Sequence, residues 1–246
     1  MTTSLTLSAL PGLPLVKAGD DLAALLRAAL QRAAITPQAG DVLAVAQKIV
    51  SKAEGRSIAL ASVRPSPAAI TLAAQTGKDA RLVELILSES ERVVRARPNL
   101  IIVKHRLGFV MANAGIDQSN VGEEGHALLL PENPDASAAR LSAALGLPVV
   151  ITDSFGRAWR RGTVGVAIGA AGLPALRDLR GQPDLFGRTL MVSITGFADE
   201  IAAAAGLLMG QGAEAQPAVM VRGLALGGDA LPAAELLRPD AEDLFQ

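Results

Sequence analysis

One loop-like segment of the chain gathers oxygen atoms that could bind a divalent cation. Asp117, Ser119 and Asn120 stand within four consecutive residues, in the segment 113–120. Carboxylate, hydroxyl and amide oxygens are the ligands that Mg²⁺ or Mn²⁺ prefers in proteins. An Asx-turn that satisfies its own backbone is an equally good explanation of the same residues. The segment is therefore a candidate metal-binding loop, with that alternative open.

A second acidic position is followed by a group of cations. Asp153 and Ser154 come directly after the apolar run 148–152. We therefore expect a carboxylate and a hydroxyl at the carboxyl end of a buried strand, where α/β sheets commonly bind ligands. The next cations in the sequence could hold a triphosphate or another anionic substrate through bidentate contacts, although a solvated arginine cluster is the alternative. These cations are Arg157, Arg160 and Arg161.

Two further segments could approach a phosphate. Lys48 and Lys52 follow the apolar run 41–47, but the sequence there lacks the spacing of a P-loop, so the signal is weak by itself. The segment Met209–Gln216 contains glycines that let backbone approach a ligand closely. A helix C-cap followed by an ordinary loop is the more frequent explanation of such a segment.

Composition excludes several classes of protein. The 246 residues include no cysteine, which excludes disulfides, thiol catalysis and iron–sulfur clusters. A net charge of −1 and 2% aromatic residues argue against a nucleic-acid binder. The sequence has no basic, apolar leader and no long apolar run, so we expect a cytoplasmic protein with no membrane partner. His105 and His126 lie in no metal-ligand spacing and are expected to be structural or solvent-facing.

The pattern of apolar residues predicts interleaved helices and strands, which indicates a mixed α/β or α+β class. A helix is expected from Asp20 to about Arg32, and Ser66 with Pro67 is expected to cap the next one. The other expected helices contain Leu82, Leu85 and Ile86, follow Pro134, and start at Asp199. Strands are expected at 41–47, 100–103, 109–112, 148–152, near Met191 and at 218–221, with a glycine-rich stretch at 164–172.

Six separated segments together resemble one family, the coenzyme F420-0:L-glutamate ligases, also called F420 γ-glutamyl ligases. They agree in order over nearly the whole chain, which is far more specific than any one of them. The resemblance implies the mixed α/β fold of that family and an intertwined homodimer. It also implies a single catalytic unit over residues 1–246, with two interleaved subdomains as the alternative, and no C-terminal nitroreductase-like flavin domain. The segments are Gly12–Leu22, Gly40–Arg56, Asn113–Val121, Thr152–Gly169, Ala198–Gly212 and Pro217–Gly223.

The resemblance also implies a site for GTP and two divalent cations. Asp117 would bind one metal, and Asp153, Ser154 and Gln211 would help to hold the second. Some family members carry a carboxylate at the position of Gln211, and an amide oxygen is a weaker ligand for a hard cation. Asn120 and Lys52 would contact the nucleotide. The rest of the GTP pocket would be Leu13, Pro14, Leu15, Val16, Gln47, Lys48, Met209, Gly210, Gln211, Gly212, Ala213, Glu214, Ala215 and Gln216.

The activity that the resemblance implies is the joining of L-glutamate, through its α-amine, to the deazaflavin coenzyme F420-0 in coenzyme F420 biosynthesis. GTP would phosphorylate the acceptor carboxylate, and Lys52, Arg157 and Arg161 would stabilise the phosphoryl oxygens, with Mg²⁺ or Mn²⁺ at two sites and K⁺ as a further candidate ion. Further γ-linked glutamates are an extension of the same reaction. Two alternatives stay open: a non-catalytic homologue that binds GTP or a metabolite, and a ligase of the same mechanism for another carboxylate.

Overall fold

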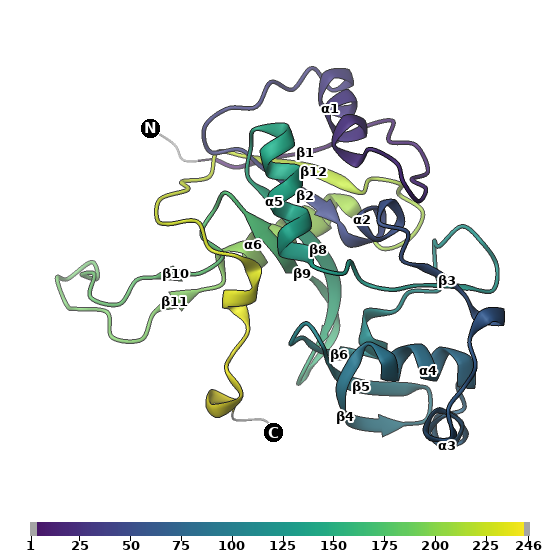
Figure 1. Ribbon diagram of the computed structural model, residues 1–246. Coiled ribbons are helices and arrows are strands. Elements are labelled where there is room, and N and C mark those ends of the chain that lie inside the picture. The colour runs from purple at the N-terminus through teal and green to yellow at the C-terminus, as the bar shows by residue number, and fades with distance from the viewer. Residues whose placement is uncertain (1–3, 244–246) are drawn as a thin grey trace.

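The computed structural model describes residues 4–243 and centres on a five-stranded sheet (Figure 1). β2 and β8 are parallel, and the other neighbours in the sheet are antiparallel. The predicted mixed α/β class is therefore confirmed. In spatial order the strands are β1 (Thr6–Ala9), β12 (Ala218–Arg222), β2 (Val42–Ala46), β8 (Val149–Arg157) and β9 (Arg160–Ala171).

Helices cover both faces of this sheet because successive residues of its central strand point to opposite sides. Leu43 and Val45 of β2 pack into a core with the helices of one face, and Val42 and Ala44 pack against the helix of the other. The first face carries α1 (Leu22–Arg32), α2 (Gln47–Ala53) and α5 (Pro134–Leu145), and the second carries α6 (Phe197–Met209). Among residues 4–243, no helix is long and apolar enough to cross a membrane.

A smaller unit has its own sheet and its own core. Its three strands are ordered β4-β5-β6, and two helices pack on them. Ser66 accepts a hydrogen bond from the Ala69 amide and Pro67 occupies the first turn, so the predicted cap is confirmed. The hairpin predicted around 105–108 also forms. The elements are α3 (Pro67–Thr76), α4 (Ala80–Ser88), β4 (Ser90–Arg97), β5 (Leu100–His105) and β6 (Val110–Ala112).

The glycine-rich stretch at 164–172 lies in strand β9 up to Ala171, and the sequence did not identify this strand. Helices cross this strand on both faces at very short range. A Cβ atom on Gly165 would lie 2.4 Å from the Ala202 carbonyl oxygen of α6, and one on Gly169 would lie 2.4 Å from the Pro134 carbonyl oxygen of α5. Glycine is therefore needed at both positions so that the helices can reach the sheet.

One strand prediction was misplaced. Met191 lies in a bend, and the strand β11 is Ile194–Thr195, which pairs with β10 (Arg177–Asp178) at the base of an arm that projects from the body in Figure 1. Met191 has no long strand beside it to pair with, so apolar character alone did not make it a strand. Helix α6 begins at Phe197, two residues before the predicted start. The remaining elements are β3 (Ser57–Ala59), β7 (His126–Leu128), and short 3₁₀ turns at Leu60–Ser62, Asn113–Gly115, Ala233–Leu236 and Asp240–Glu242.

A charged cluster joins the smaller unit to the segment that follows α2. The carboxylate of Glu89 lies 2.9 Å from the Arg56 guanidinium and 3.1 Å from that of Arg106, and His105 Nε2 lies 3.6 Å from it. Burial alone would raise the pKa of Glu89, but the neighbouring imidazole and the two guanidinium charges outweigh it and hold that pKa at about 2. Glu89 therefore stays ionised at any ordinary pH.

This cluster should make folding stability sensitive to acid. The pKa of Glu89 is lower in the folded chain, about 2, than its ordinary value of 4.5, so its stabilisation is complete above about pH 4.5 and is lost as the pH falls towards 2. We expect Glu89→Gln to lose roughly 2 to 3 kcal/mol at pH 7 and much less at pH 3. Urea unfolding at both pH values measures this, with exposed Glu235→Gln as the control. An equal loss at both pH values would contradict the electrostatic account.

Candidate functional site

The site forms where strand β2 ends and helix α2 begins. Gln47 Nε2 donates to Asp117 Oδ2 at 2.8 Å, and the Lys48 ammonium lies 2.7 Å from Asp117 Oδ1. Ser51, one helical turn on, donates to Gln47 Oε1 and fixes the direction of the amide. The backbone of Asp117 is paired in both directions with Leu128. Asp117 is thus held on three sides, and its carboxylate is aimed at the start of α2.

The prediction that Asp153 and Ser154 stand at the end of their strand is wrong, because both lie inside β8. β8 continues to Arg157 because β9 pairs with it over that whole length. The strand that ends here is β2, whose last residue, Ala46, lies opposite Thr152. The apolar run stops at 152 because the buried part of β8 stops there, whereas the strand itself continues to Arg157. Asp153 therefore still lies beside the start of α2, at the point where β2, and not its own strand β8, ends.

The electrostatics of the two carboxylates favour a bound cation. Burial, together with the charge of Asp117, raises the pKa of Asp153 to about 7, against the smaller opposing effects of the Ser154 amide, Lys48 and Gln47. A divalent cation would stabilise the ionised form of Asp153, which burial and the nearby carboxylate of Asp117 disfavour. Among residues 4–243 no group of three or more His, Cys, Asp or Glu residues could hold a metal. A metal here would therefore rely on two carboxylates and on neutral oxygens.

Neutral groups are present beside them, on the loop after α6. Gln211 Nε2 donates to Ser154 Oγ at 2.7 Å, and Asn120 Nδ2 donates to the Gly212 carbonyl oxygen at 3.1 Å. The Lys52 ammonium donates to the Asn120 carbonyl oxygen at 2.6 Å. These contacts bring together four segments that are far apart in the sequence. The oxygen ligands predicted at Asp117, Asp153, Ser154 and Gln211 thus lie around one region.

The electrostatic state of the lysines also suits an anion. Burial, and then the charge of Lys48, lowers the pKa of Lys52. A phosphate between the two ammonium groups would offset the repulsion between their charges. Lys48 and Lys52 project from α2 at a spacing of four residues, which places them on one face of the helix.

The predicted nucleotide loop Met209–Gln216 is a helix C-cap and a tight turn. Gly210 has φ 68°, and a Cβ atom there would lie 2.1 Å from the Glu214 side chain. The Glu214 carboxylate accepts a hydrogen bond from the Gly212 amide. The loop is therefore shaped by its own residues, and Gln211 and Gly212 are the two that reach across to other segments. Met209, Ala213, Ala215 and Gln216 complete it.

The N-terminal part of the predicted pocket lies beside α2 but is not joined to the rest. The Gly19 amide donates to the Ala53 carbonyl oxygen at the end of α2. Val16 is buried in the main core, whereas Leu15 is exposed. Within residues 4–243 no hydrogen bond or ion pair links Leu13, Pro14, Leu15 or Val16 to the loop 209–216.

The arginine group has no hydrogen bond or ion pair with Lys48 or Lys52 among residues 4–243. Arg157, Arg160 and Arg161 stand exposed at the tip of the β8–β9 hairpin, and the four-residue step along β8 from Asp153 to Arg157 spans roughly 13 Å. That these arginines act together with Lys52 therefore stays a prediction. The hairpin carries them outward because β8 and β9 extend beyond β2.

The two histidines take no part in this site. His105 is fully buried and its Nδ1 accepts from the Leu107 amide, so it is structural, as predicted. His126 lies half-buried with Nε2 3.2 Å from Glu123. A residue that the sequence analysis missed is Ser51, which orients Gln47. Its spacing of four residues from Gln47 within one helix was the signal that could have found it.

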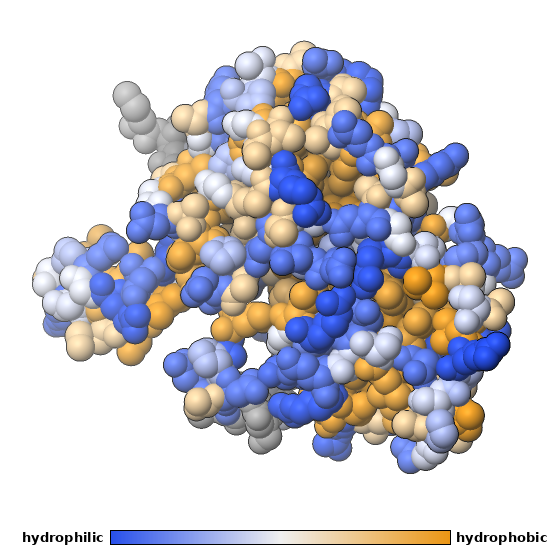
Figure 2. All heavy atoms as spheres, viewed as in Figure 1, coloured by the Kyte–Doolittle hydropathy of each residue, from blue (hydrophilic) through white to orange (hydrophobic). Residues whose placement is uncertain are grey.

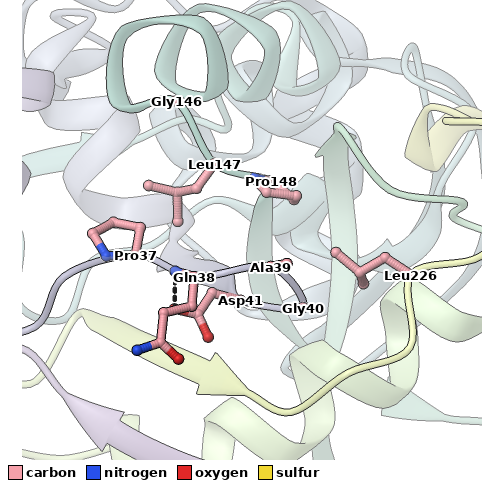
Figure 3. Close-up of a pocket in the computed structure, with 9 residues that line it drawn as sticks. All are labelled: Pro37, Gln38, Ala39, Gly40, Asp41, Gly146, Leu147, Pro148 and Leu226. Carbon is pink, nitrogen blue, oxygen red and sulfur yellow. Dashed lines mark hydrogen bonds between the residues drawn. The ribbon is translucent and has the colours of Figure 1, made fainter.

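A cavity of about 530 Å³ lies at the other end of β2 (Figure 3). Asp41 lies at its wall, fully buried, and accepts from the Gln38 amide and from Arg222. The hydrogen bond from Arg222 is the main reason that the pKa of Asp41 is lowered. This carboxylate is fully partnered, so it ties β12 to the loop before β2. The cavity is otherwise lined mostly by apolar groups: Pro37, Ala39, Leu147, Pro148 and Leu226.

Comparison with known proteins gives one consistent match. The family model described as F420-0:Gamma-glutamyl ligase matches residues 12–223. The chain is 46% identical over 253 residues to a protein of Methanothermobacter thermautotrophicus named coenzyme F420:L-glutamate ligase, covering 98% of this chain and 99% of that one. Proteins of the same name from Archaeoglobus fulgidus and Methanopyrus kandleri are 45% and 49% identical, covering 96% and 85% of this chain and 94% and 83% of theirs.

Proposed function

The chain belongs to the F420-0:gamma-glutamyl ligase family, and on that basis we propose that it joins L-glutamate to coenzyme F420-0 and forms an amide bond. The observation that best supports this activity is the meeting of Asp117, Asp153, Lys48 and Lys52 where β2 gives way to α2. Carboxylates beside ammonium groups suit a phosphate with its divalent cation. Ligation needs such a phosphate to activate a carboxylate.

The proposed phosphate donor is GTP. Lys48 and Lys52 would contact its phosphates from α2, and the Asn120 side chain and the Gly212 backbone would border the nucleotide. The residues that would hold two divalent cations, Mg²⁺ or Mn²⁺, are Asp117, Asp153, Ser154 and Gln211. When bound, these cations supply positive charge beside the phosphate oxygens.

The proposed reaction has two steps. An oxygen of the acceptor's terminal carboxylate attacks the γ-phosphorus of GTP, the bond from that phosphorus to the β–γ bridging oxygen breaks, and GDP leaves. The α-amine of L-glutamate then attacks the acyl carbon of the resulting acyl phosphate. Phosphate leaves with the electrons of the broken C–O bond, and the nitrogen loses a proton. The ammonium of Lys52 would offset negative charge on the transferred phosphoryl group.

We further propose that the protein works as a homodimer of single catalytic units. The projecting β10–β11 arm supports this, because Leu185 is 99%, Phe186 85% and Val192 85% exposed. Figure 2 shows apolar surface on this arm among hydrophilic side chains. Exposed apolar groups on a projecting arm are typical of a surface that a second chain covers. Sedimentation equilibrium of the chain and of Phe186→Asp tests this proposal.

Mass spectrometry tests the proposed activity. The purified chain would be incubated with F420-0, L-glutamate, GTP and Mn²⁺. We expect an acceptor whose mass has increased by one or more glutamyl units, with GDP in at least equal amount. Replacing GTP by ATP in a parallel reaction tests the donor, and replacing F420-0 by other carboxylates tests the acceptor. GTP binding without any amide product would instead favour the non-catalytic homologue, for which the neutral Gln211 is the supporting observation.

A further inference from the structure

The β8–β9 hairpin carries a cluster that the proposed chemistry leaves unused. Beyond Thr152 the two strands pair only with each other and form a ribbon that leaves the five-stranded sheet. In Figure 1 the ribbon bends away from the sheet towards β6. Its tip presents Trp159, which is 90% exposed and is the only tryptophan in the chain. Arg157, Arg160 and Arg161 are its neighbours along the same hairpin.

The backbone at the tip is poorly matched to its residue. Trp159 has φ 65°, a conformation that hairpin turns normally give to glycine or asparagine. A bulky L-residue there is strained, and strain of this kind is most often kept where it serves a function. The side chain is almost wholly in solvent, so no burial of its ring offsets the strain. Folding alone therefore does not account for a tryptophan at this position.

The three arginines have no partner of opposite charge. Within residues 4–243 none of them forms an ion pair, and Arg157 donates only to the Arg161 carbonyl oxygen, at 3.3 Å. Three adjacent guanidinium groups repel each other unless an anion lies among them. Tryptophan offers a flat face on which a ring can stack. Together these groups suit a ligand that is both aromatic and anionic.

We propose that this tip binds the acceptor, with its flat heterocyclic ring on Trp159 and its anionic tail along the arginines. This inference rests on the proposed function, since F420-0 unites a deazaflavin ring and a terminal carboxylate. The distance supports it: from Arg157 back to Asp153 is roughly 13 Å along one strand. A long acceptor that lies on the ribbon would place its ring at the tip and its carboxylate at the predicted phosphoryl-transfer site.

A binding measurement without GTP tests the proposal separately from catalysis. Because the chain has one tryptophan, its fluorescence reports directly on the tip, and we expect saturable quenching by F420-0. Calorimetry should show Trp159→Gly binding F420-0 roughly tenfold more weakly or worse, with an unchanged Kd for GTP. Glycine suits the positive φ, so this variant should fold. Ile70→Ala, at an exposed apolar side chain of α3, and Arg95→Ala, at an exposed position of β4, are the controls for Trp159→Gly and Arg160→Ala, which should both weaken F420-0 binding.

The proposal would be overturned if Trp159→Gly had an unchanged Kd for F420-0 or a higher Kd for GTP. It would also be overturned if this variant no longer self-associated, because the tip would then be a contact between subunits. In turnover, Trp159→Gly should raise the KM for the acceptor by a similar factor and change kcat little. If the wild-type chain binds F420-0 through Trp159 but forms no amide, the proposed activity fails and the acceptor site stands.

Discussion

Asp153→Asn is expected to lower turnover by about a thousandfold or more and, at the same time, to stabilise the chain at pH 8 in the absence of metal. The loss of activity follows because the substitution removes one of only two carboxylates at the predicted metal site, and charge stabilisation by bound metal contributes several kcal/mol to such reactions. The gain in stability follows because burial and the Asp117 charge disfavour the ionised form.

The sign of the stability change depends on pH. The pKa of Asp153 is raised from 3.8 to about 7 in the folded chain, so well below pH 3.8 the group is neutral in both states and costs nothing, and at pH 4 the cost is still small. Above about pH 7 it is ionised in both states, and the folded state is destabilised by roughly 2 to 4 kcal/mol. Asparagine, which is neutral and of similar size, removes this cost.

Urea unfolding with a chelator present, at pH 4 and pH 8, measures the effect on stability. We expect Asp153→Asn to be more stable than the parent at pH 8 and nearly equal at pH 4. Asp229→Asn, at an exposed position away from the site, is the control for both assays. Near-normal turnover of Asp153→Asn would remove this residue from the predicted metal site, and lower stability at pH 8 would contradict the electrostatic account of its burial.

Gly165→Ala is expected to have the second largest effect, through packing. The new Cβ atom would lie 2.4 Å from the Ala202 carbonyl oxygen, which belongs to helix backbone and cannot turn aside. Helix α6 must move away from β9, at a cost of about 3 kcal/mol or more. Because α6 leads directly into the loop 209–216, we also expect GTP to bind at least tenfold more weakly.

The same hairpin offers a matched control. Gly156 lies opposite Thr163 in the β8–β9 pair, its φ is not positive, and a Cβ atom there would meet nothing within 4 Å. Gly156→Ala should therefore change the free energy of unfolding by less than about 1 kcal/mol. Thermal unfolding and calorimetry with GTP compare the two variants. Similar losses in both would show that contact with α6 is not what requires glycine at Gly165.

Sequence patterns predicted the elements that local chemistry determines. Asp21 and Ser66 cap their helices as the residue types suggested, and β2 was visible as a compact apolar run. Strand β9 was missed because its glycines are required by two helices that cross it closely. Such contacts between distant segments cannot be recognised from a local sequence pattern. Strand β4 was missed because nearly all its residues are exposed and its pairing with β5 is interrupted by register shifts.

The grouping of the candidate site residues in space was predicted better than the geometry around them, while their roles stay predictions. The resemblance named the four oxygen ligands and the two lysines, and hydrogen bonds and ion pairs link them into one region. The length of β8 could not be predicted from the sequence. Apolar residues mark only the buried part of the strand, whereas pairing with β9 extends it beyond the core to Arg157. The hairpin places the arginines at its tip, roughly 13 Å along the strand from Asp153, and their contact with the phosphates stays a prediction.

The position of β12 has a consequence for synthesis of the chain. This strand, near the C-terminal end of the sequence, pairs with β1 on one side and with β2 on the other. While a ribosome is still making the preceding residues, β1 and β2 have no strand between them, and their backbone edges are open to wrong partners. The main sheet therefore cannot close until Ala218–Arg222 has left the exit tunnel. Nascent chains stalled before that point should depend most on chaperones, whereas the smaller unit, whose strands are close together in sequence, can form earlier.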